Sequence, residues 1–241
     1  MLNTTKIHKS WREFFEQEKI QKMIEEISLN IGTNIVPKEE NVFRFASQDL
    51  SKVKCIWLGQ DPYYTMYNED TPVANGRSFQ PDDLNNWNEK FSQKSLQNII
   101  RLIYKNYNNI QEYDDIKKFS IIREEINSND FKILQPKEWF TSLEQQGVLF
   151  LNTYLTTIPH AANKHEKYWK EFSKELLKYI SEKNPNIYWF LWGDKAINNK
   201  QYIKGIVYES NHPTFCSKKY ETDFLKSNCF KDTMNVINWL G

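Results

Sequence analysis

The sequence has 241 residues, of which 39% are hydrophobic, and its 15 Phe, 13 Tyr and 8 Trp can fill one sizeable hydrophobic core. Basic and acidic residues nearly balance, at 32 and 31, and only 7 Gly and 8 Pro are present, which excludes a globally disordered, collagen-like or low-complexity chain. No run approaches the roughly 20 apolar residues of a membrane span. The acid-containing N-terminal segment suits neither a signal peptide nor a transit peptide. We therefore expect one domain over residues 1–241, located in the cytoplasm, or in the nucleus if the source is eukaryotic.

The cysteines and histidines give no metal-binding pattern. Cys55, Cys216 and Cys229 include no closely spaced pair, and their odd number leaves at least one thiol unpaired, as in a reducing compartment. The four histidines form no His-x-x-x-His pair on one helix face. We expect no metal and no cofactor.

Charge is distributed unevenly along the chain. Residues 161–241 carry 13 Lys and 9 acidic residues, a net charge of +4, whereas the preceding 160 residues have a net charge of −3. This asymmetry permits a basic nucleic-acid-binding face. It does not establish one, because lysines on helices are more often ordinary solvated surface.

Hydrophobic patterns predict the elements in chain order. Ser10 and Glu13 have capping-box spacing, and the apolar residues after them recur at helical intervals, which predicts a helix over about 11–28. Short apolar runs without alternation predict four strands covered on both faces. These runs are 55–58, 148–151, 187–192 and 206–208, and helical patterns lie between and after them, at 96–103, 169–180 and 224–237.

This alternation predicts a three-layer α/β/α fold with a central, mostly parallel four-stranded sheet. The polar and aromatic segment at about 106–129 shows no clear strand, and we interpret it as an insertion or a mobile excursion. Ligands of parallel sheets bind beyond the carboxyl ends of the strands. Asp61, Asn152 and His212 follow three of the predicted strands and are expected to converge there, although each taken singly is more often a turn or surface residue.

At these positions the sequence closely resembles the signatures of family 1 uracil-DNA glycosylases. The main matches are 59–63, 147–153 with Leu155 and Thr156, and His212-Pro213. Secondary matches occur at 37–43, at 53–58, at Ser95, Leu96 and Asn98, at His165 with Trp169, and at 190–193. The matches are collinear and cover nearly the whole chain apart from 106–129. An isolated Asp-Pro dipeptide would carry no such meaning.

The resemblance implies hydrolysis of the bond between uracil N1 and deoxyribose, which requires stabilisation of a uracil anion and of a sugar with oxocarbenium character. Asp61 would orient the attacking water and stabilise the sugar. Neutral His212 and backbone N–H groups near Gln60 would donate to uracil O2.

The resemblance also implies how the base is selected. The amide of Asn152 would accept from uracil N3–H and donate to O4, a pattern that cytosine reverses. The Tyr63 ring would occupy the space of the thymine methyl group, and Phe79 would stack on the base.

DNA contacts are implied by the same comparison. A uracil in a duplex must be flipped out of the stack to reach such a pocket. Ser95, Thr214 and Ser217 match hydroxyls that hold backbone phosphates, although ordinary capping explains such hydroxyls equally well. His165 would add phosphate attraction.

Among the departures from the family pattern, two concern the catalytic water and the wedge. Tyr64 stands where the family has a histidine that helps to hold the catalytic water. Cys216 replaces the leucine that wedges into the vacated base stack, so we hypothesise that Phe215 supplies the wedge.

We therefore predict a DNA glycosylase that releases uracil from single-stranded or duplex DNA, leaves an abasic site and starts base-excision repair. A proteinaceous inhibitor or replication factor is a candidate partner, no membrane is involved, and the chain is expected to be a monomer. Three alternatives stay open: a glycosylase of broader specificity, a catalytically weakened glycosylase-like DNA-binding or replication-accessory protein, and an unrelated α/β hydrolase. The last has no Gly-x-Ser-x-Gly elbow to support it.

Overall fold

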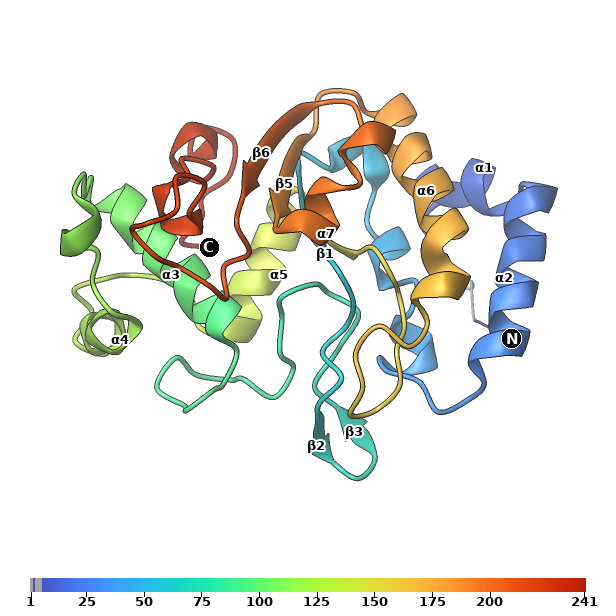
Figure 1. The fold of residues 1–241 in the computed structure, drawn as a ribbon, viewed down its shortest axis with the longest axis horizontal. Coiled ribbons are helices and arrows are strands. Elements are labelled where there is room, and N and C mark those ends of the chain that lie inside the picture. Colours follow the sequence, from blue (N-terminus) through green and yellow to red (C-terminus); the bar gives the residue numbers. More distant parts are fainter. Residues whose placement is uncertain (1, 3–5) are drawn as a thin grey trace.

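The central feature of the fold is a four-stranded parallel sheet, seen in a computed structural model that describes residue 2 and residues 6–241. Its strands are β1 (Cys55–Gly59), β4 (Val148–Asn152), β5 (Tyr188–Trp192) and β6 (Ile206–Ser210), in the order β4-β1-β5-β6 (Figure 1). The predicted three-layer α/β/α class is confirmed. Every expected strand lies within two residues of its observed bounds.

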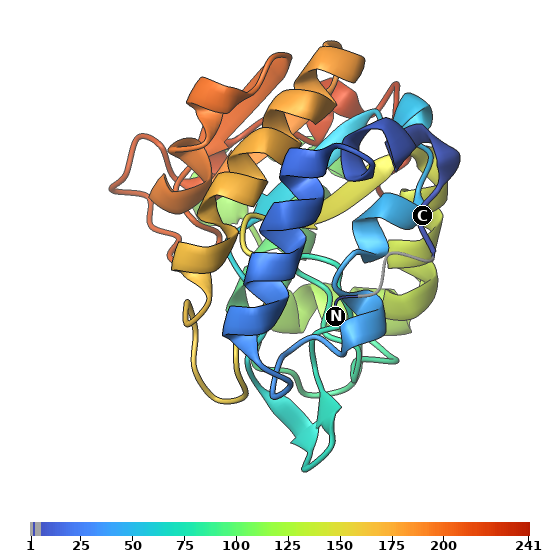
Figure 2. The same ribbon diagram turned by 90° about the vertical axis from the view of Figure 1, so that its right-hand side faces the viewer.

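Helices cover both faces of this sheet. One side carries α2 (Glu18–Ile31) and α6 (Glu166–Lys183), and the other carries α3 (Lys94–Tyr107) and α5 (Pro136–Gln146), as Figures 1 and 2 show. A small hairpin of β2 (Met66–Asn68) and β3 (Thr71–Pro72) projects away from the sheet (Figure 1). Short helices complete the described elements, among them α1 (Arg12–Phe15), α4 (Phe119–Asn127) and α7 (Asp194–Ile197). None of the helices seen in the described residues is long and apolar enough to cross a membrane.

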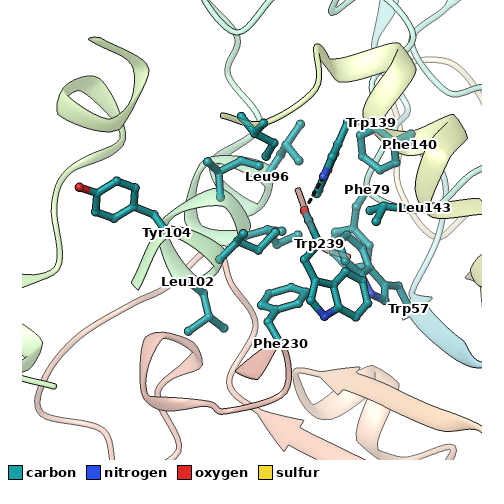
Figure 3. Close-up of a cluster of buried hydrophobic side chains, with 14 of the residues drawn as sticks. Trp57, Phe79, Leu96, Leu102, Tyr104, Trp139, Phe140, Leu143, Phe230 and Trp239 are labelled. Carbon is teal, nitrogen blue, oxygen red and sulfur yellow. Dashed lines mark hydrogen bonds between the residues drawn. The ribbon is translucent and has the colours of Figure 1, made fainter. Parts of the chain in front are cut away.

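Strands β1, β4 and β5 are buried on both faces of the sheet, to which successive side chains point alternately. Trp57, Phe150 and Phe190 enter one hydrophobic cluster, while Ile56 and Leu149 enter the other. The first cluster is dominated by aromatic rings (Figure 3). In it, the Trp139 indole Nε1 donates to the Trp239 carbonyl oxygen at 2.7 Å, which satisfies a buried donor and joins α5 to the C-terminal segment.

The edge strand β6 differs from the expectation of strands covered on both faces. Ile206 is 51% exposed, and only Ser210 of this strand is fully buried. An apolar run alone does not reveal which strand will lie at the sheet edge. β6 pairs only with β5.

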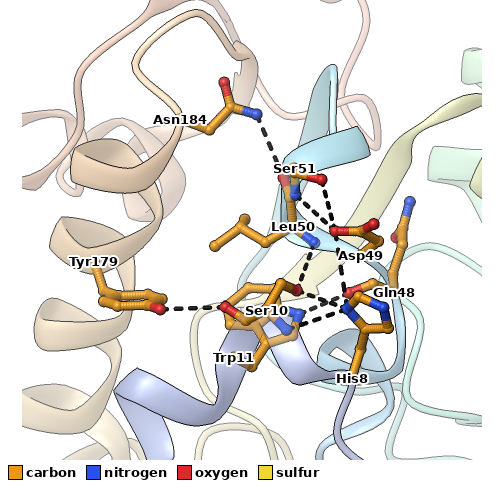
Figure 4. A network of polar contacts seen from close by, with 9 residues as sticks. All are labelled: His8, Ser10, Trp11, Gln48, Asp49, Leu50, Ser51, Tyr179 and Asn184. Carbon is orange, nitrogen blue, oxygen red and sulfur yellow. Dashed lines mark hydrogen bonds and ion pairs between the residues drawn. The ribbon is translucent and has the colours of Figure 1, made fainter.

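The predicted N-terminal helix over 11–28 is interrupted. A 3₁₀ turn and α1 end at Phe15, extended Gln17 follows, and α2 then begins at Glu18. Ser10 does not act as the helix cap: its hydroxyl accepts from the Leu50 backbone N–H at 3.0 Å, and His8 caps the first turn instead (Figure 4). A long-range hydrogen bond therefore replaces the predicted capping box.

The segment 106–129, interpreted from the sequence as an insertion or a mobile excursion, is helical over much of its length. It contains the end of α3 and all of α4, and α4 buries Phe119, Ile122 and Ile126 in the aromatic cluster. These side chains have helical spacing, but the charged residues between them obscure the pattern. Within the segment, α4 packs on α3, which covers the sheet.

The C-terminal helix predicted over 224–237 is absent. Two 3₁₀ turns, Phe224–Lys226 and Lys231–Thr233, take its place. Asp223 caps the first turn by accepting from the Leu225 N–H at 2.9 Å, and the Thr233 hydroxyl donates to the Cys229 carbonyl oxygen at 2.6 Å. Local side-chain hydrogen bonds thus compete successfully with a continuous helix.

Candidate active site

A pocket of about 260 Å³ lies at the carboxyl edge of the sheet, where parallel strands bring their following loops together. It is built from the loop after β1, the last residue of β4 and the loop after β6. The lining residues are Gly59, Gln60, Asp61, Pro62, Tyr63, Tyr64, Arg77, Phe79, Ser95, Asn152, His212 and Thr214. The structure thus brings together most of the residues that the sequence singled out.

Asp61 is held at the mouth of this pocket by a loop that is remote in sequence. Its carboxylate Oδ2 accepts from the Asn163 backbone N–H at 2.9 Å. Burial raises the pKa of Asp61 above its ordinary 3.8, the Asn163 hydrogen bond opposes this rise, and nearby Glu166 adds to it. A fixed, partly desolvated carboxylate of this kind can orient a water molecule and stabilise positive charge.

His212 is positioned as a neutral hydrogen-bond donor. The Thr214 backbone N–H donates to Nδ1 at 3.2 Å, so the proton of the neutral ring is carried by Nε2. Burial lowers the pKa of His212 below 6.5, which favours the uncharged ring at neutral pH. Gly193 permits this placement: its φ is +88°, and a Cβ there would lie 2.9 Å from the His212 Cβ.

Asn152 ends β4 and is 5% exposed. Its side chain lines the pocket and has no hydrogen-bond partner within the part of the chain that the structure describes. Gly59 makes room for it, because a Cβ at position 59 would lie 2.3 Å from Asn152 Oδ1. The amide therefore keeps its donors and acceptor free for a ligand.

Aromatic side chains form the walls of the pocket. Phe79 is held at φ +62°, a left-handed conformation that costs free energy in a non-glycine residue, and its ring is stacked at 29° to His212 with 6.3 Å between the centroids. The Tyr63 hydroxyl donates to the Phe79 carbonyl oxygen at 3.3 Å and lies 3.5 Å from the Ser95 hydroxyl. Burial raises the pKa of Tyr63 to about 12, so this phenol stays neutral.

Two predicted site residues lie at the rim. Tyr64 is 43% exposed, and its carbonyl oxygen accepts from the His160 N–H at 2.8 Å. The Gln60 side chain donates to the Asn163 amide oxygen, and the Gln60 carbonyl accepts from Tyr154 N–H. The loop after β1 is thus anchored to the loop that precedes α6.

The loop 212–217 presents an apolar side chain to solvent beside the pocket. Phe215 is 73% exposed, whereas Cys216 is half-buried and its thiol contacts the Pro213 carbonyl oxygen at 3.5 Å. Thr214 lines the pocket, and the Ser217 backbone N–H donates to the Asp223 carboxylate. Of the two wedge candidates, only Phe215 protrudes.

The prediction that His165 contacts phosphate is corrected by its burial. His165 is 5% exposed, and its Nδ1 lies 2.9 Å from the Thr156 hydroxyl, which also accepts from Trp169 Nε1 at 2.7 Å. Burial lowers the pKa of His165, which disfavours a charged ring. His165 thus supports the loop before α6 from the inside and does not form a surface contact.

Sequence reasoning missed Asn163. This residue adopts φ +60° and contacts both Asp61 and Gln60 from a point about 100 residues away in the chain. The only sequence signal is that Asn adopts the left-handed backbone conformation more often than most residues. A contact of this sequence separation is invisible to local pattern analysis.

The fold and the site together define a class: an α/β enzyme that combines a carboxylate, a neutral imidazole and a free amide in one pocket at the carboxyl edge of a parallel sheet. Within residues 2 and 6–241, no group of three or more His, Cys, Asp or Glu side chains could hold a metal ion.

Comparison with known proteins identifies the family. Residues 47–237 match the model of the Uracil DNA glycosylase superfamily. Uracil-DNA glycosylase of Streptococcus gordonii is 30% identical over 97% of this chain and 99% of its own, and that of Mycoplasmopsis pulmonis is 30% identical over 95% and 96%. The chain belongs to the Uracil DNA glycosylase superfamily.

Solved structures agree on the fold. The UNG structure from Nitratifractor salsuginis superposes with a TM-score of 0.71 at 17% identity, covering 97% of this chain and 92% of that chain. The mimivirus uracil-DNA glycosylase gives a TM-score of 0.60 at 24% identity, covering 87% and 70%.

Proposed function

We propose that this protein is a uracil-DNA glycosylase that hydrolyses the N-glycosidic bond of uracil in DNA, releases free uracil and leaves an abasic site for base-excision repair. The main observation that supports this proposal is that Asp61, Asn152 and His212 line one pocket of about 260 Å³. This volume lies just below the range of drug-sized sites and suits a single base. The motif at 59–63 and the His212-Pro213 pair support assignment to family 1.

The mechanism follows from charge development at the two ends of the breaking bond. As the C1′–N1 bond lengthens, the sugar becomes positive and the uracil ring becomes negative. The Asp61 carboxylate stabilises the sugar, orients the attacking water and accepts its proton as the water oxygen bonds to C1′. The Nε2–H of His212 donates to uracil O2, where negative charge accumulates.

Base selection rests on Asn152 and Tyr63. The free amide of Asn152 accepts from N3–H and donates to O4 of uracil, and cytosine presents the opposite pattern at both atoms. Tyr63 lines the same pocket and is tied through its hydroxyl to Phe79, so its ring can exclude the 5-methyl group of thymine. The duplex must release the uracil from its stack before these contacts form.

Asn152→Asp is expected to abolish the preference for uracil over cytosine. A carboxylate only accepts hydrogen bonds, so it repels uracil O4 but can accept from the cytosine amino group. Base release from matched U- and C-containing oligonucleotides measures the ratio. Asn186→Asp, at an exposed turn position before β5 and at the opposite edge of the sheet from the pocket, serves as the charge-matched control. An unchanged ratio of uracil to cytosine release in Asn152→Asp would contradict the role of Asn152 in base selection.

The overall function is tested by release of free base from single-stranded and duplex oligonucleotides that contain U, T or C at one position. Release from U alone supports the proposal, and release from T as well favours the alternative of a broader glycosylase. Tight binding of uracil-containing DNA without release would favour the DNA-binding or replication-accessory alternative. That outcome would make Tyr64 and Cys216 the first positions to restore to the family pattern.

Phe215 is proposed as the wedge that enters the vacated stack, because it is 73% exposed beside the pocket and Cys216 is not. Phe215→Ala is expected to slow uracil release from duplex DNA by about tenfold, the equivalent of losing roughly 1.4 kcal/mol of compensation for unstacking. Release from single strands should change little, because no stack has to be opened. An equal loss of rate on duplex and single-stranded substrates would contradict the assignment of Phe215 as the wedge.

The candidate partners are uracil-containing DNA and a proteinaceous inhibitor. Two of the similar solved structures are mimivirus UNG variants in complex with UGI. A protein that covers the pocket and the exposed Phe215 would block the same surface that DNA uses.

A further inference from the structure

A second cavity, of about 320 Å³, lies between α3 and α4 and is lined by cations. Its lining includes four basic side chains and no acidic one: Lys94, Arg101, Lys118 and Arg123, with Gln97, Asn98, Phe119 and Ser120. Among the described residues, none of these four cations has a carboxylate within 4 Å. An ordinary protein surface usually mixes charges of both signs. The positive potential of this cavity therefore favours the binding of an anion.

The cavity adjoins the uracil pocket. Lys94, Gln97, Asn98 and Arg101 are spaced i, i+3, i+4 and i+7 on one face of α3, a stripe of roughly 10 Å at 1.5 Å per residue. Its first member directly precedes Ser95, which lines the uracil pocket. A DNA strand rises about 3.4 Å per nucleotide along the helix axis, so the stripe spans about three nucleotides.

Part of this surface is already fixed in place. Asn98 Nδ2 donates to the Pro213 carbonyl oxygen at 2.6 Å, which joins α3 to the loop 212–217. Arg101 donates to Asn98 Oδ1 at 2.9 Å and to the Lys117 carbonyl oxygen at 2.8 Å. The guanidinium is thus held by neutral acceptors that leave its charge uncompensated.

The start of α4 completes the cavity. Lys118 is the N-cap residue, no side chain caps this end, and the first turn contains no acidic residue. The positive end of the helix dipole therefore adds to the four side-chain charges. Ser120 supplies a hydroxyl at the same place.

We propose that this basic cavity binds the phosphodiester backbone of the DNA strand whose uracil occupies the active-site pocket, about two to three nucleotides from the flipped base. The proposal rests on the proposed glycosylase function and gives the segment 106–129 a role, because α4 and its N-cap residue supply two of the four cations. It extends DNA binding beyond the hydroxyls of Ser95, Thr214 and Ser217. The contacts are to phosphate, so they carry no base preference.

The test compares the wild type with the Lys118→Gln/Arg123→Gln double variant on two single-stranded substrates: a trinucleotide with a central uracil, and a 15-mer with a central uracil. Neither side chain makes a hydrogen bond or ion pair within the described part of the chain, so the fold should persist. On the 15-mer we expect KM to rise roughly tenfold, and the dependence of log kcat/KM on log salt to flatten by about 1.4 for two lost phosphate contacts. On the trinucleotide, which cannot reach the cavity, both parameters should equal those of the wild type.

Lys52→Gln/Lys204→Gln is the matched control, because it removes two exposed lysines that precede β1 and β6 at the opposite edge of the sheet. It should behave as the wild type on both substrates. Identical length and salt dependence in the wild type and Lys118→Gln/Arg123→Gln would overturn the proposal. Fluorescence anisotropy of a labelled uracil-containing 15-mer compares the same variants by binding alone, without catalysis. A wild type that releases no uracil would contradict the proposed function. The binding data would then still test the proposed role of the cavity.

Discussion

Replacement of Asp61 by asparagine is expected to slow uracil release by about 10² to 10⁴-fold, the range of a positioned acid or base group. Asparagine has nearly the same shape and can still accept from the Asn163 N–H. It cannot carry the negative charge that stabilises the sugar and polarises the water. The binding of uracil-containing DNA should change little, because the proposed base and phosphate contacts come from other residues.

Single-turnover release of uracil and equilibrium binding of the same oligonucleotide separate these effects. Asp70→Asn is the matched control, since Asp70 is exposed at the turn of the nearby β2–β3 hairpin and does not line the pocket. A folded Asp61→Asn protein with the wild-type rate would refute the assignment of Asp61. A loss of binding as large as the loss of rate would assign Asp61 to ground-state recognition instead.

The sheet and the meeting of its loops could be predicted from the sequence, because both follow from short-range patterns. Buried parallel strands appear as apolar runs such as 148–151. Parallel topology then places Asp61, Asn152 and His212 at one edge without any knowledge of strand order. The order β4-β1-β5-β6 itself was not predictable, because nothing local in the sequence states which strands pair.

The errors arise where long-range contacts override local preference. Ser10 has the spacing of a helix cap, yet it bonds to Leu50, and His165 lies in a family motif but is buried against Thr156. The helix α4 was missed because charged residues interrupt its three buried side chains. The placement of Ser10 and of His165 thus depends on partners 40 and 9 residues away, respectively.

The site also depends on positions whose importance is visible only in three dimensions. Gly193 follows β5 and appears in the sequence as one residue of a secondary motif. In the structure, a Cβ at that position would collide with His212. Asn163 similarly holds Asp61 through a backbone N–H, a contact that no side-chain pattern can reveal. The polar side chains that line the pocket were predictable from the sequence, whereas the groups that orient them were not.

Replacement of His212 by leucine is expected to lower the rate of uracil release by about 10² to 10³-fold, the usual effect of removing one donor to a developing anion. Leucine fills a similar volume but cannot donate to uracil O2. The ring must be neutral to act as the structure places it, because protonation of Nδ1 would set its N–H against the Thr214 N–H that now donates to it.

The pH dependence of the rate provides the readout specific to this role. Burial lowers the pKa of His212, so the neutral ring persists as pH falls to 6.5 and is lost only at lower pH. Burial raises the pKa of Asp61 above 3.8, so this carboxylate also loses its active, ionised form as the pH falls. The wild-type rate should therefore be flat near pH 7 and decline on the acid side, and in His212→Leu the remaining decline should follow Asp61 alone. A wild-type rate that rises as pH falls through 6.5 would show that imidazolium is the donor, contrary to the hydrogen bond from Thr214.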